Sequence, residues 1–306
     1  MNRLDAVFAR WTRNFAVIAV AAGALCSVAQ AQTAGGSSAT ELRAKFDQLG
    51  SALTNNPFKR PLFIDSKESS SQVRGDVYAV MDYPFAKVQQ ALRDPANWCD
   101  VMILHPNTKQ CESSKSGRPV LRVSIGKKLE QAVEDAYLLN LAYSSVSSTP
   151  EYFQVQLNAK EGPLGTSNYR FVVEAVSLAG NRSFIHLSYS YASSLAGQLA
   201  TKAYLATAGR SKIGFSATGK DSAGQPRYIN GVRGAVERNA MRYYLAIDAY
   251  LWSANAPPGR QFEQRLQTFA SSLEQYPRQL HEADINTFIA MKQREYERQR
   301  LSQKAL

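Results

Sequence analysis

The sequence contains few of the residues that build metal and redox centres. It has three cysteines and three histidines among 306 residues. His105, His186 and His281 show no ligand spacing with one another or with the cysteines, whereas metal sites need several such residues at set intervals. We therefore expect no bound metal ion.

Motifs of the common enzyme classes are also missing. The chain has no phosphate-binding loop, no HExxH, no nucleophile elbow and no GxGxxG in a strand-to-helix setting. The adjacent carboxylates Glu134 and Asp135 are predicted on a strand, where neighbouring side chains point to opposite faces and cannot act together as acid and base. These absences predict that the protein needs no cofactor, and they favour a function other than catalysis.

Positive charge exceeds negative charge but is not concentrated. The chain has 36 Lys and Arg against 25 Asp and Glu, a net charge of +11. It contains no long run of like charges and no RNA-binding or zinc-finger signature, so we expect no nucleic-acid partner. The net charge favours peripheral contact with an anionic membrane surface, and the simpler alternative is that it keeps the protein dispersed.

The chain begins like a secretory precursor. Arg3, Arg10 and Arg13 precede an apolar run from Phe15 to Val28, and Ala29-Gln30-Ala31 forms a small-x-small cleavage site. The apolar run is short for a membrane span, although an uncleaved anchor is the alternative. We predict that residues 1–31 are a signal peptide cleaved near Ala31 and that the protein is periplasmic or secreted. Cleavage leaves a net charge of +9.

Export determines how the remaining cysteines are interpreted. Cys99 and Cys111 are the two cysteines that remain after cleavage. A pair of cysteines in an oxidising compartment is most simply a disulfide. Closing a loop of this length stabilises a fold by roughly 3 kcal/mol in the chain-entropy model.

Apolar periodicity then divides the chain into elements. Residues 40–53 have a helical pattern, and two short helices are expected between residues 84 and 104, interrupted at Pro95. Runs with a period of two residues predict strands, and their short connections favour antiparallel neighbours in a curved sheet. The expected strands are residues 62–67, 73–81, 108–113, 120–126, 132–147, 152–159, 166–178 and 182–193.

A long helix is expected at Gly231–Ala254. Val232, Val236, Tyr243 and Ile247 recur at spacings of four and seven residues along one side of it. The more aromatic faces of the last two strands are assigned to this helix.

The segments before and after the long helix are predicted to have less regular secondary structure. Residues 194–230 precede it and include an alanine-rich helical stretch at 194–209. After Pro257-Pro258-Gly259, helices are expected at 261–275 and 283–301. The last helix is polar nearly all round, so its end is expected to be solvated or loosely attached.

The order of these elements resembles the helix-grip fold of the START-like, Bet v 1-like (SRPBCC) superfamily. The resemblance is carried by GDVYAVMDYPFAKVQQALRDPANWCDVM at 75–102, by the strand series ending at Ser193, and by VRGAVERNAMRYYLAIDAYL at 232–251. It implies an α+β fold in which a curved antiparallel sheet wraps round the long C-terminal helix. It also implies an apolar cavity between them that holds a lipid or another hydrophobic small molecule. Members of the superfamily usually lack an insert such as 194–230, which is expected to act as a lid or a plug.

The expected organisation follows from these boundaries. Residues 1–31 form the signal peptide and 32–61 a leader with the N-terminal helix. Residues 62–256 form the START-like domain with the insert 194–230, and residues 257–306 form a C-terminal helical extension.

Candidate site residues are chosen for an apolar cavity with a few polar groups. Aromatic residues on the predicted inner faces are the candidate ligand-binding residues, and ordinary core packing is the alternative for each of them. They are Tyr137, Tyr169, Phe171, Tyr189, Tyr191, Tyr243 and Tyr250. Basic residues that flank the insert and the helix start are candidates for a rim that binds an anionic head group, namely Arg210, Lys212, Arg227 and Arg233. His105 is predicted in a turn, and His186 is predicted to be solvated or hydrogen-bonded.

Three functions remain open at this point. The resemblance and the export signal favour a binding or carrier protein for a hydrophobic or amphipathic, lipid-like molecule. The first alternative is a cavity enzyme of the cyclase or hydrolase type. The second is an envelope interaction protein with a vestigial cavity, which would hold a partner through the helices after Pro257.

Overall fold

The computed structural model describes residues 38–114, 117–194, 197–199 and 212–305. The predicted signal peptide, most of the alanine-rich stretch and Arg210 lie outside these residues. Eight antiparallel strands form one sheet in the order β1-β2-β8-β7-β6-β5-β4-β3. These strands are β1 Leu62–Glu68, β2 Gln72–Met81, β3 Thr108–Ser113, β4 Val120–Ile125, β5 Tyr137–Ser148, β6 Tyr152–Glu161, β7 Thr166–Leu178 and β8 Arg182–Ser193.

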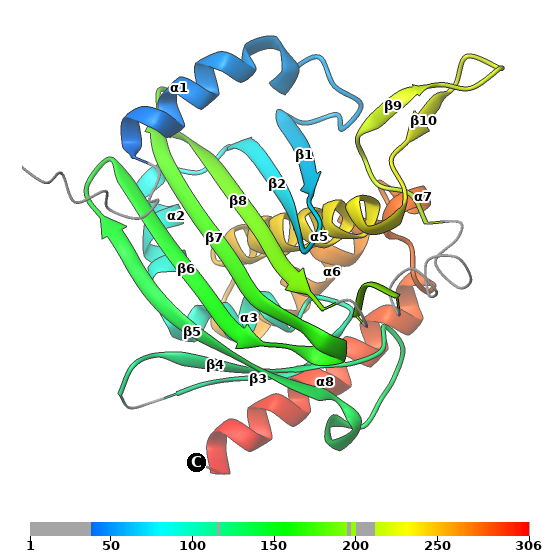
Figure 1. Cartoon of the computed structure of the whole chain (residues 1–306). Helices are drawn as coiled ribbons and strands as arrows, with labels where there is room; N and C mark the ends of the chain where they lie inside the picture. Colours follow the sequence, from blue (N-terminus) through cyan, green and yellow to red (C-terminus); the bar gives the residue numbers. More distant parts are fainter. Residues whose placement is uncertain (1–37, 115–116, 195–196, 200–211, 306) are drawn as a thin grey trace, which may run out of the picture. The chain divides into compact units, whose positions relative to one another are not determined.

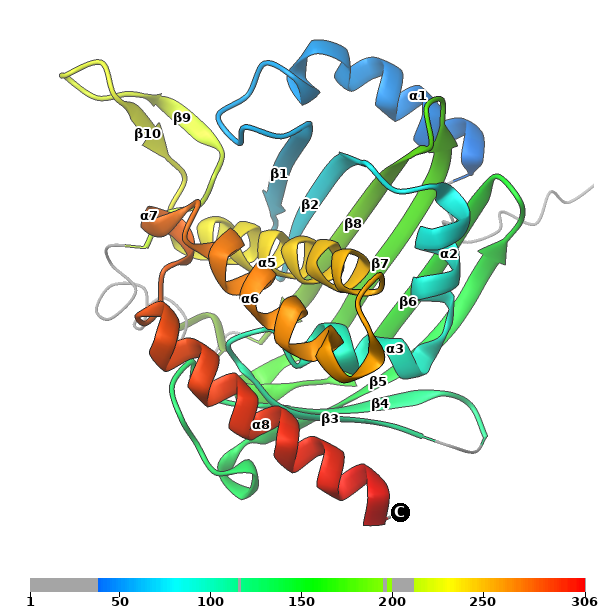
Figure 2. The same ribbon diagram turned by 180° about the vertical axis from the view of Figure 1, so that it is seen from behind.

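Helices lie on both faces of this sheet (Figures 1 and 2). The helix α1 crosses the outer face, and the long helix α5 crosses the inner face with α6 packed behind it. The helices are α1 Ala39–Leu49, α2 Phe85–Arg93, α3 Pro95–Met102, α5 Gly231–Ser253, α6 Gln261–Leu273, α7 Pro277–Leu280 and α8 Ile285–Ala305. The strands β9 Ala217–Lys220 and β10 Pro226–Tyr228 form a separate hairpin before α5. Among the described residues no helix has both the length and the hydrophobicity to cross a bilayer.

The strand predictions are confirmed, with one local exception. The fifth strand was expected to begin at Ala132, but residues Val133–Asp135 form a short helical turn and β5 begins at Tyr137. The side chain of Gln131 donates to the carbonyl of Asp135 at 2.6 Å and so closes this turn. Glu134 and Asp135 therefore lie in an exposed turn rather than on a strand.

The long helix α5 is buried on two sides. Ala240 and Ile247 join the core formed with the sheet, and Tyr244 and Leu251 are also wholly or almost wholly buried. The close approach of α5 to β2 depends on Gly75, because a Cβ there would lie 3.0 Å from the carbonyl oxygen of Val236. The predicted arrangement, a curved antiparallel sheet around a long C-terminal helix, is confirmed.

A second apolar layer lies on the outer face of the sheet. Leu42 and Leu49 of α1 pack with Val80, Val176 and Phe184 of the strands. The helix begins with a capping box, in which Ser38 and Glu41 satisfy each other's backbone amides. The N-terminal amphipathic helix predicted from the sequence is confirmed, and it covers the end of the sheet away from α8.

The predicted disulfide is also present. Cys99 of α3 is bonded to Cys111 of β3, twelve positions further along the chain. Both cysteines are buried in the main core. The bond therefore ties α3 to the edge strand of the sheet.

The last helix is present as predicted, but the expectation that its end is solvated or loosely attached is wrong. The helix α8 lies along β3, and its Lys292, Glu295 and Gln299 are buried. Glu295 accepts from Lys292 at 2.6 Å and from Lys109 of β3 at 2.8 Å. Burial lowers the pKa of Lys292 to about 8, although the charge of Glu295 and its hydrogen bond oppose this shift.

Backbone groups of β3 provide further partners of α8. Lys292 donates to the carbonyl of Thr108 at 2.7 Å, and the side-chain oxygen of Gln299 accepts from the amide of Cys111 at 2.8 Å. An edge strand exposes such groups to unwanted pairing unless something covers them. The polarity of α8 thus matches the polar edge that it covers, which is why an apolar stripe is weak in its sequence.

Part of the insert is also integrated in the core. Phe215 packs between Phe58 and Tyr276, with ring centroids 5.8 and 5.6 Å away. The buried carboxylate of Glu237 on α5 accepts from the amides of Phe215 and Ser216 at 2.6 and 2.9 Å. The chain therefore enters α5 along a fixed path.

Replacing Glu295 should release α8 from the sheet. Glu295→Gln leaves two buried lysines without their carboxylate, and removing one member of a buried ion pair costs about 3 kcal/mol or more. Urea denaturation should show this loss of unfolding free energy. The control is Glu297→Gln on the exposed face of the same helix, which should change the unfolding free energy by less than about 0.5 kcal/mol. Equal effects of the two substitutions would contradict the role assigned to Glu295.

Candidate ligand-binding site

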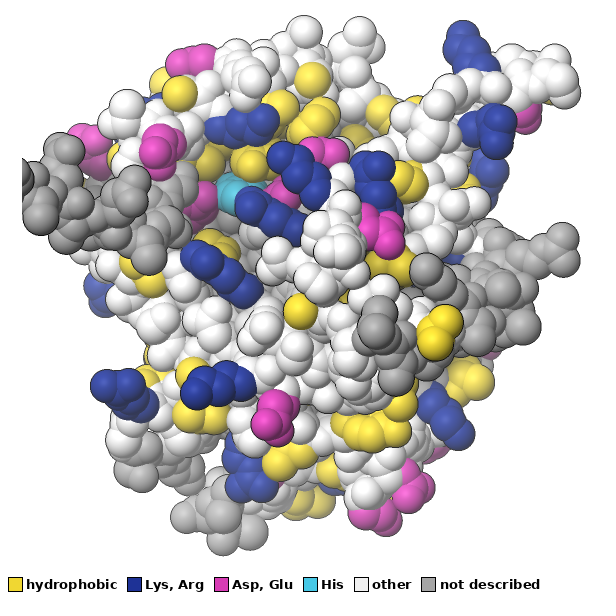
Figure 3. Space-filling view, viewed as in Figure 1, with side chains coloured by type: hydrophobic (Ala, Val, Ile, Leu, Met, Phe, Trp, Pro, Cys, Tyr) yellow, Lys and Arg dark blue, Asp and Glu magenta, His cyan; other side chains and the backbone are white. Residues whose placement is uncertain are grey.

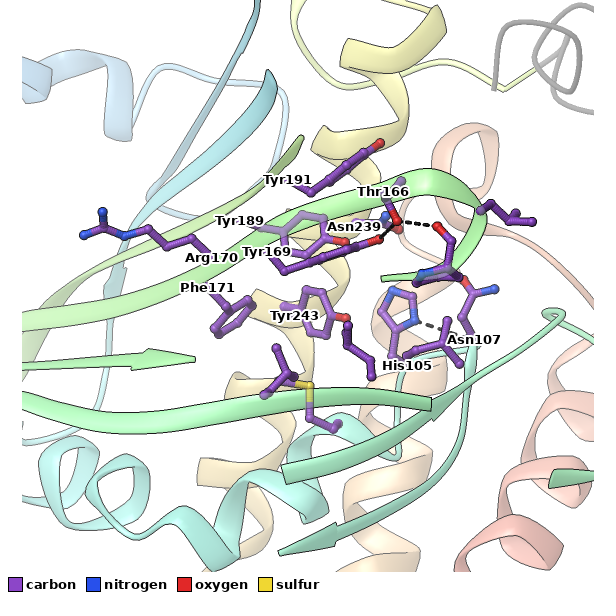
Figure 4. A pocket seen from close by; sticks show the side chains of 16 residues that line it. His105, Asn107, Thr166, Tyr169, Arg170, Phe171, Tyr189, Tyr191, Asn239 and Tyr243 are labelled. Atoms are coloured by element: carbon purple, nitrogen blue, oxygen red, sulfur yellow. Dashed lines mark hydrogen bonds between the residues drawn. The ribbon is translucent and has the colours of Figure 1, made fainter. Parts of the chain in front are cut away.

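A pocket of about 220 Å³ lies between the inner face of the sheet and α5 (Figure 4). Its walls come from β4, β5, β7, β8 and α5, from the end of α3 and the turn after it, and from the turn before β7. The described lining residues are Met102, His105, Asn107, Ile125, Leu139, Leu141, Pro163, Leu164, Thr166, Tyr169, Arg170, Phe171, Tyr189, Tyr191, Asn239 and Tyr243.

The aromatic rings form one connected cluster. Tyr243 of α5 packs edge-on against Phe171 of β7 with ring centroids 4.9 Å apart, and it lies 5.5 Å from Tyr189 of β8. Tyr169 stacks on Tyr191 at 5.4 Å. These residues meet because positions i and i+2 of a strand share a face, and β7 and β8 are neighbours. Five of the seven predicted ligand-binding residues are thus brought together.

The other two predicted residues lie elsewhere. Tyr137 begins β5 and is 51% exposed. Tyr250 lies on α5 beneath Arg265, whose guanidinium carbon is 4.4 Å from the centre of its ring. Neither residue lines the pocket. Periodicity predicted the correct face of β5 and α5 for these two tyrosines. It could not predict that they lie beyond the pocket along the strand and the helix.

The pocket tyrosines are protonated at neutral pH. Burial raises the pKa of Tyr191 to about 12 and holds the pKa values of Tyr189 and Tyr243 further above 10. The hydroxyl of Tyr169 lies 2.8 Å from that of Thr166. Those of Tyr189, Tyr191 and Tyr243 make no hydrogen bond to a described residue and can therefore donate to a ligand.

His105 is a pocket residue whose role the sequence did not indicate. It lies in a turn, as predicted, but it is buried and stacks on Tyr243 at 4.8 Å. Burial and the positive charges of Arg242, Lys292 and Lys128 hold its pKa well below 6.5, so the ring is neutral. Its Nδ1 accepts from the amide of Asn107 at 3.2 Å, which assigns the proton to Nε2. In the sequence, the apolar residues that precede His105 were the only indication that its side chain would be buried.

The basic residues proposed for an anionic head group do not meet at this pocket. Lys212 donates to the carbonyl of His281 at 2.6 Å, and Arg233 donates to that of Ser66 at 2.6 Å. Arg227 is exposed on the β9–β10 hairpin, and Arg210 lies outside the described residues. Among the described lining residues, the basic side chain is that of Arg170.

A cluster of polar side chains lies on the outer face of the sheet, away from the pocket. Nδ1 of His186 is 2.6 Å from Glu174, and Nε2 is 2.8 Å from Asp76. Figure 3 is viewed from this side and shows histidine, acidic and basic side chains together at the surface. The prediction of a hydrogen-bonded His186 is confirmed. Because both ring nitrogens are engaged by carboxylates, this histidine has none available as a general base.

The three groups of this cluster are charged. Burial alone would lower the pKa of His186, but its hydrogen bonds to Asp76 and Glu174 and their charges raise it overall. Burial alone would raise the pKa values of the two carboxyls, but hydrogen bonds and charge from His186 lower them, and Arg74 adds to this effect at Asp76. The cluster therefore stabilises the fold between the titration ranges of carboxyls and histidine.

This arrangement predicts a pH-dependent contribution to stability. A raised histidine pKa contributes stability that is complete below about pH 6.5 and is lost as the pH rises through the raised value. The lowered carboxyl pKa values contribute stability that is present above about pH 4 and is lost below it. Urea denaturation should show the largest difference between the wild type and His186→Gln in this window. His281→Gln is the control, and a difference independent of pH would contradict the charged state of the cluster.

No family model matches the sequence, and no curated protein matches it. Among solved structures, Ara h 8.0201 is 11% identical to this chain, with a TM-score of 0.35. The alignment covers 63% of this chain and 99% of the Ara h 8.0201 chain.

Two enzymes are among the other similar structures. Norcoclaurine synthase from Thalictrum flavum is 14% identical, covering 40% of this chain and 72% of its own, with a TM-score of 0.31. The Zhui aromatase/cyclase from a Streptomyces species is 12% identical, covering 68% of this chain and 95% of its own, with a TM-score of 0.32. In this chain itself, the strand order and the position of α5 on the sheet are those of the helix-grip fold expected from the sequence.

Proposed function

We propose that the protein binds or carries a small hydrophobic or amphipathic molecule between the sheet and α5. The observation that supports this proposal is the pocket of about 220 Å³ walled by aromatic side chains, with the hydroxyls of Tyr189 and Tyr243 unpaired among the described residues. Binding sites for small molecules are typically apolar concavities with a few polar groups that orient the ligand.

The size of the pocket restricts the ligand. An apolar cavity of about 150 Å³ accepts benzene, and pockets for drug-sized molecules run from about 300 Å³ upward. The pocket of about 220 Å³ therefore suits one aromatic ring or a short chain. A lipid-like ligand would place only one end in it.

The chemistry of the walls restricts the ligand further. Protonated tyrosines are hydrogen-bond donors, so the ligand should carry an acceptor oxygen or nitrogen that meets Tyr189 or Tyr243. Phe171, Leu139 and Leu141 provide apolar contact on the sheet side. A phenol or another small aromatic molecule with one oxygen meets both requirements.

The enzyme alternative has less support. Among the described lining residues, His105 is the group whose ordinary pKa lies nearest to neutral, and its surroundings make it a weaker base. General acid–base catalysis is most effective when the pKa lies near the working pH. No carboxylate is among the described lining residues to form an acid–base pair with His105.

The interaction-protein alternative also has less support. Leu266 and Phe269 of α6 are wholly buried in the core, and α8 is docked on β3 through buried polar groups. The faces of these helices that a partner would need are thus engaged within the chain.

Export is part of the proposal. Its support is the secretory pattern of residues 1–31 and the disulfide between Cys99 and Cys111, because disulfides persist mainly in oxidising compartments. The net positive charge supports contact with an anionic membrane surface, where a hydrophobic ligand could be exchanged.

Filling the pocket should abolish binding. Leu139 and Leu138 are neighbours on β5, but Leu139 lines the pocket whereas Leu138 is 49% exposed. Leu139→Trp should remove binding of phenol and indole by occupying their space, and Leu138→Trp should bind them like the wild type. Isothermal titration calorimetry measures both affinities.

Thermal unfolding provides an independent measurement of the same prediction. A ligand at a concentration of 100 Kd adds about 2.7 kcal/mol to the unfolding free energy. This corresponds to a rise in Tm of roughly 5–10 °C for a domain of this size. The rise should occur in the wild type and in Leu138→Trp but not in Leu139→Trp. Equal rises in both variants would place the binding site elsewhere, and no rise in the wild type with any small aromatic compound would contradict the proposed function.

A further inference from the structure

A second pocket of about 230 Å³ shares a lining residue with the pocket between the sheet and α5, which we call the aromatic pocket. Its described lining residues come from the β1–β2 turn and the start of β2 at Glu68–Val73, from β8 at Tyr191 and Ser193, and from Gln198 and Val232. Tyr191 lines this pocket as well as the aromatic pocket. Tyr191 is the one residue that the two described linings have in common.

The second pocket, which we call the serine pocket, is polar and lacks positive charge among its described lining residues. The hydroxyls of Ser70, Ser71 and Ser193 make no hydrogen bond to another described residue. Gln198 donates to the carbonyls of Ser70 and Ser193 at 2.9 and 3.2 Å, and so ties the turn to the end of β8. The charged side chain among the described lining residues is that of Glu68, a carboxylate.

This composition determines which kind of polar group of a ligand the serine pocket can bind. Hydroxyl and amide groups can donate to and accept from a neutral polar ligand. An anionic group would lose its hydration without gaining a cationic partner among the described lining residues, and it would be repelled by Glu68. The serine pocket is therefore suited to a neutral group with several hydroxyls, in contrast to the anionic head group expected from the sequence.

Tyr191 can connect the two pockets. Its ring is held by stacking on Tyr169 at 5.4 Å and by contact with Tyr189 at 5.9 Å, and its hydroxyl has no partner among the described residues. A rotation of this ring needs no hydrogen bond to be broken. Figure 4 shows Tyr191 at the edge of the cluster of tyrosines.

We propose that the two pockets are compartments of one site for an amphipathic ligand. The apolar ring or short chain of the ligand occupies the aromatic pocket, and its neutral, hydroxyl-bearing head group passes Tyr191 into the serine pocket. This inference rests on the proposed function, since it assumes that the aromatic pocket binds the apolar part. It adds the chemical class of the head group and assigns Tyr191 to the boundary between the two parts.

Three probes with the same ring test the head group. They are phenol, 3-phenoxy-1,2-propanediol, which adds a neutral diol, and phenoxyacetate, which adds an anion. Two additional neutral hydrogen bonds should make the diol bind about tenfold tighter than phenol. Phenoxyacetate should bind at least about tenfold more weakly than the diol. Calorimetric titration of the mature protein measures the three Kd values.

Variants locate the binding of the head group. Val232→Phe fills the serine pocket without adding bulk to the aromatic pocket, since Val232 lines only the former. It should remove the advantage of the diol and leave the Kd of phenol within about twofold of its wild-type value. Val146→Phe, at a valine that is 50% exposed and lines neither pocket, is the matched control and should change neither affinity.

A larger ring at the boundary tests the assignment of Tyr191. Tyr191→Trp should weaken binding of the diol more than binding of phenol, whereas Tyr137→Trp, at an exposed tyrosine, should preserve the ratio of the two Kd values. A diol that binds no tighter than phenol, phenoxyacetate as the tightest ligand, or a Val232→Phe variant that keeps the advantage of the diol would each overturn the two-compartment site while leaving the proposed function in place. Absence of binding by all three probes would instead contradict the proposed function.

Discussion

The packing of α5 on the inner face of the sheet is the contact on which the site depends. Gly75 allows β2 to approach the backbone of α5, and the buried Glu237 accepts from Ser66 of β1 at 2.6 Å. These contacts hold the helix at β1 and β2, at one edge of the sheet. Tyr243 then projects from the middle of α5 toward Phe171 and Tyr189, which lie on strands further from that edge. The pocket occupies the space that this arrangement leaves between helix and sheet.

Sequence reasoning was most successful where a local period determines the answer. Half-buried strands alternate their side chains, so the pairs Tyr169–Phe171 and Tyr189–Tyr191 could be assigned to the inner face before the structure was known. The same reasoning also assigned Tyr137 and Tyr250 to the pocket, which neither residue lines. Periodicity predicts the face of an element on which a side chain lies, but not how far along that element the pocket extends. The basic residues near the insert were grouped by their position in the sequence, yet Lys212 and Arg233 are paired with separate backbone carbonyls. Contacts between distant segments set these outcomes.

Buried polar residues account for the largest errors of the sequence analysis. The end of the last helix was expected to be solvated or loosely attached because its sequence is polar. However, Lys292 and Glu295 are partnered by Lys109 and by the backbone of β3, and Gln299, nearer the end, accepts from the amide of Cys111. Hydropathy measures the cost of burying an unpartnered group, and that cost falls once hydrogen bonds and an opposite charge are supplied. The position of α8 has a consequence for the site. It supports β3, which pairs with β4, and β4 in turn pairs with β5, the strand that contributes Leu139 and Leu141 to the pocket wall.

Burial explains why the titratable groups of the pocket are mostly neutral, and nearby cations add to this effect at His105. Glu282 forms ion pairs with Arg242, Lys128 and Lys212, so cations outnumber the carboxylate behind His105. Burial, together with the positive charges of Arg242 and Lys128, holds the pKa of His105 low and keeps it unprotonated, and burial keeps Tyr189 and Tyr243 protonated. Across the neutral pH range the pocket therefore offers uncharged donors beside apolar walls, with Arg170 as the charged side chain among its described lining residues. Apolar walls select a ligand by its shape, and uncharged donors select it by the position of its acceptor. Since neither depends on a charged group, the selectivity of the site should change little with pH or with salt concentration.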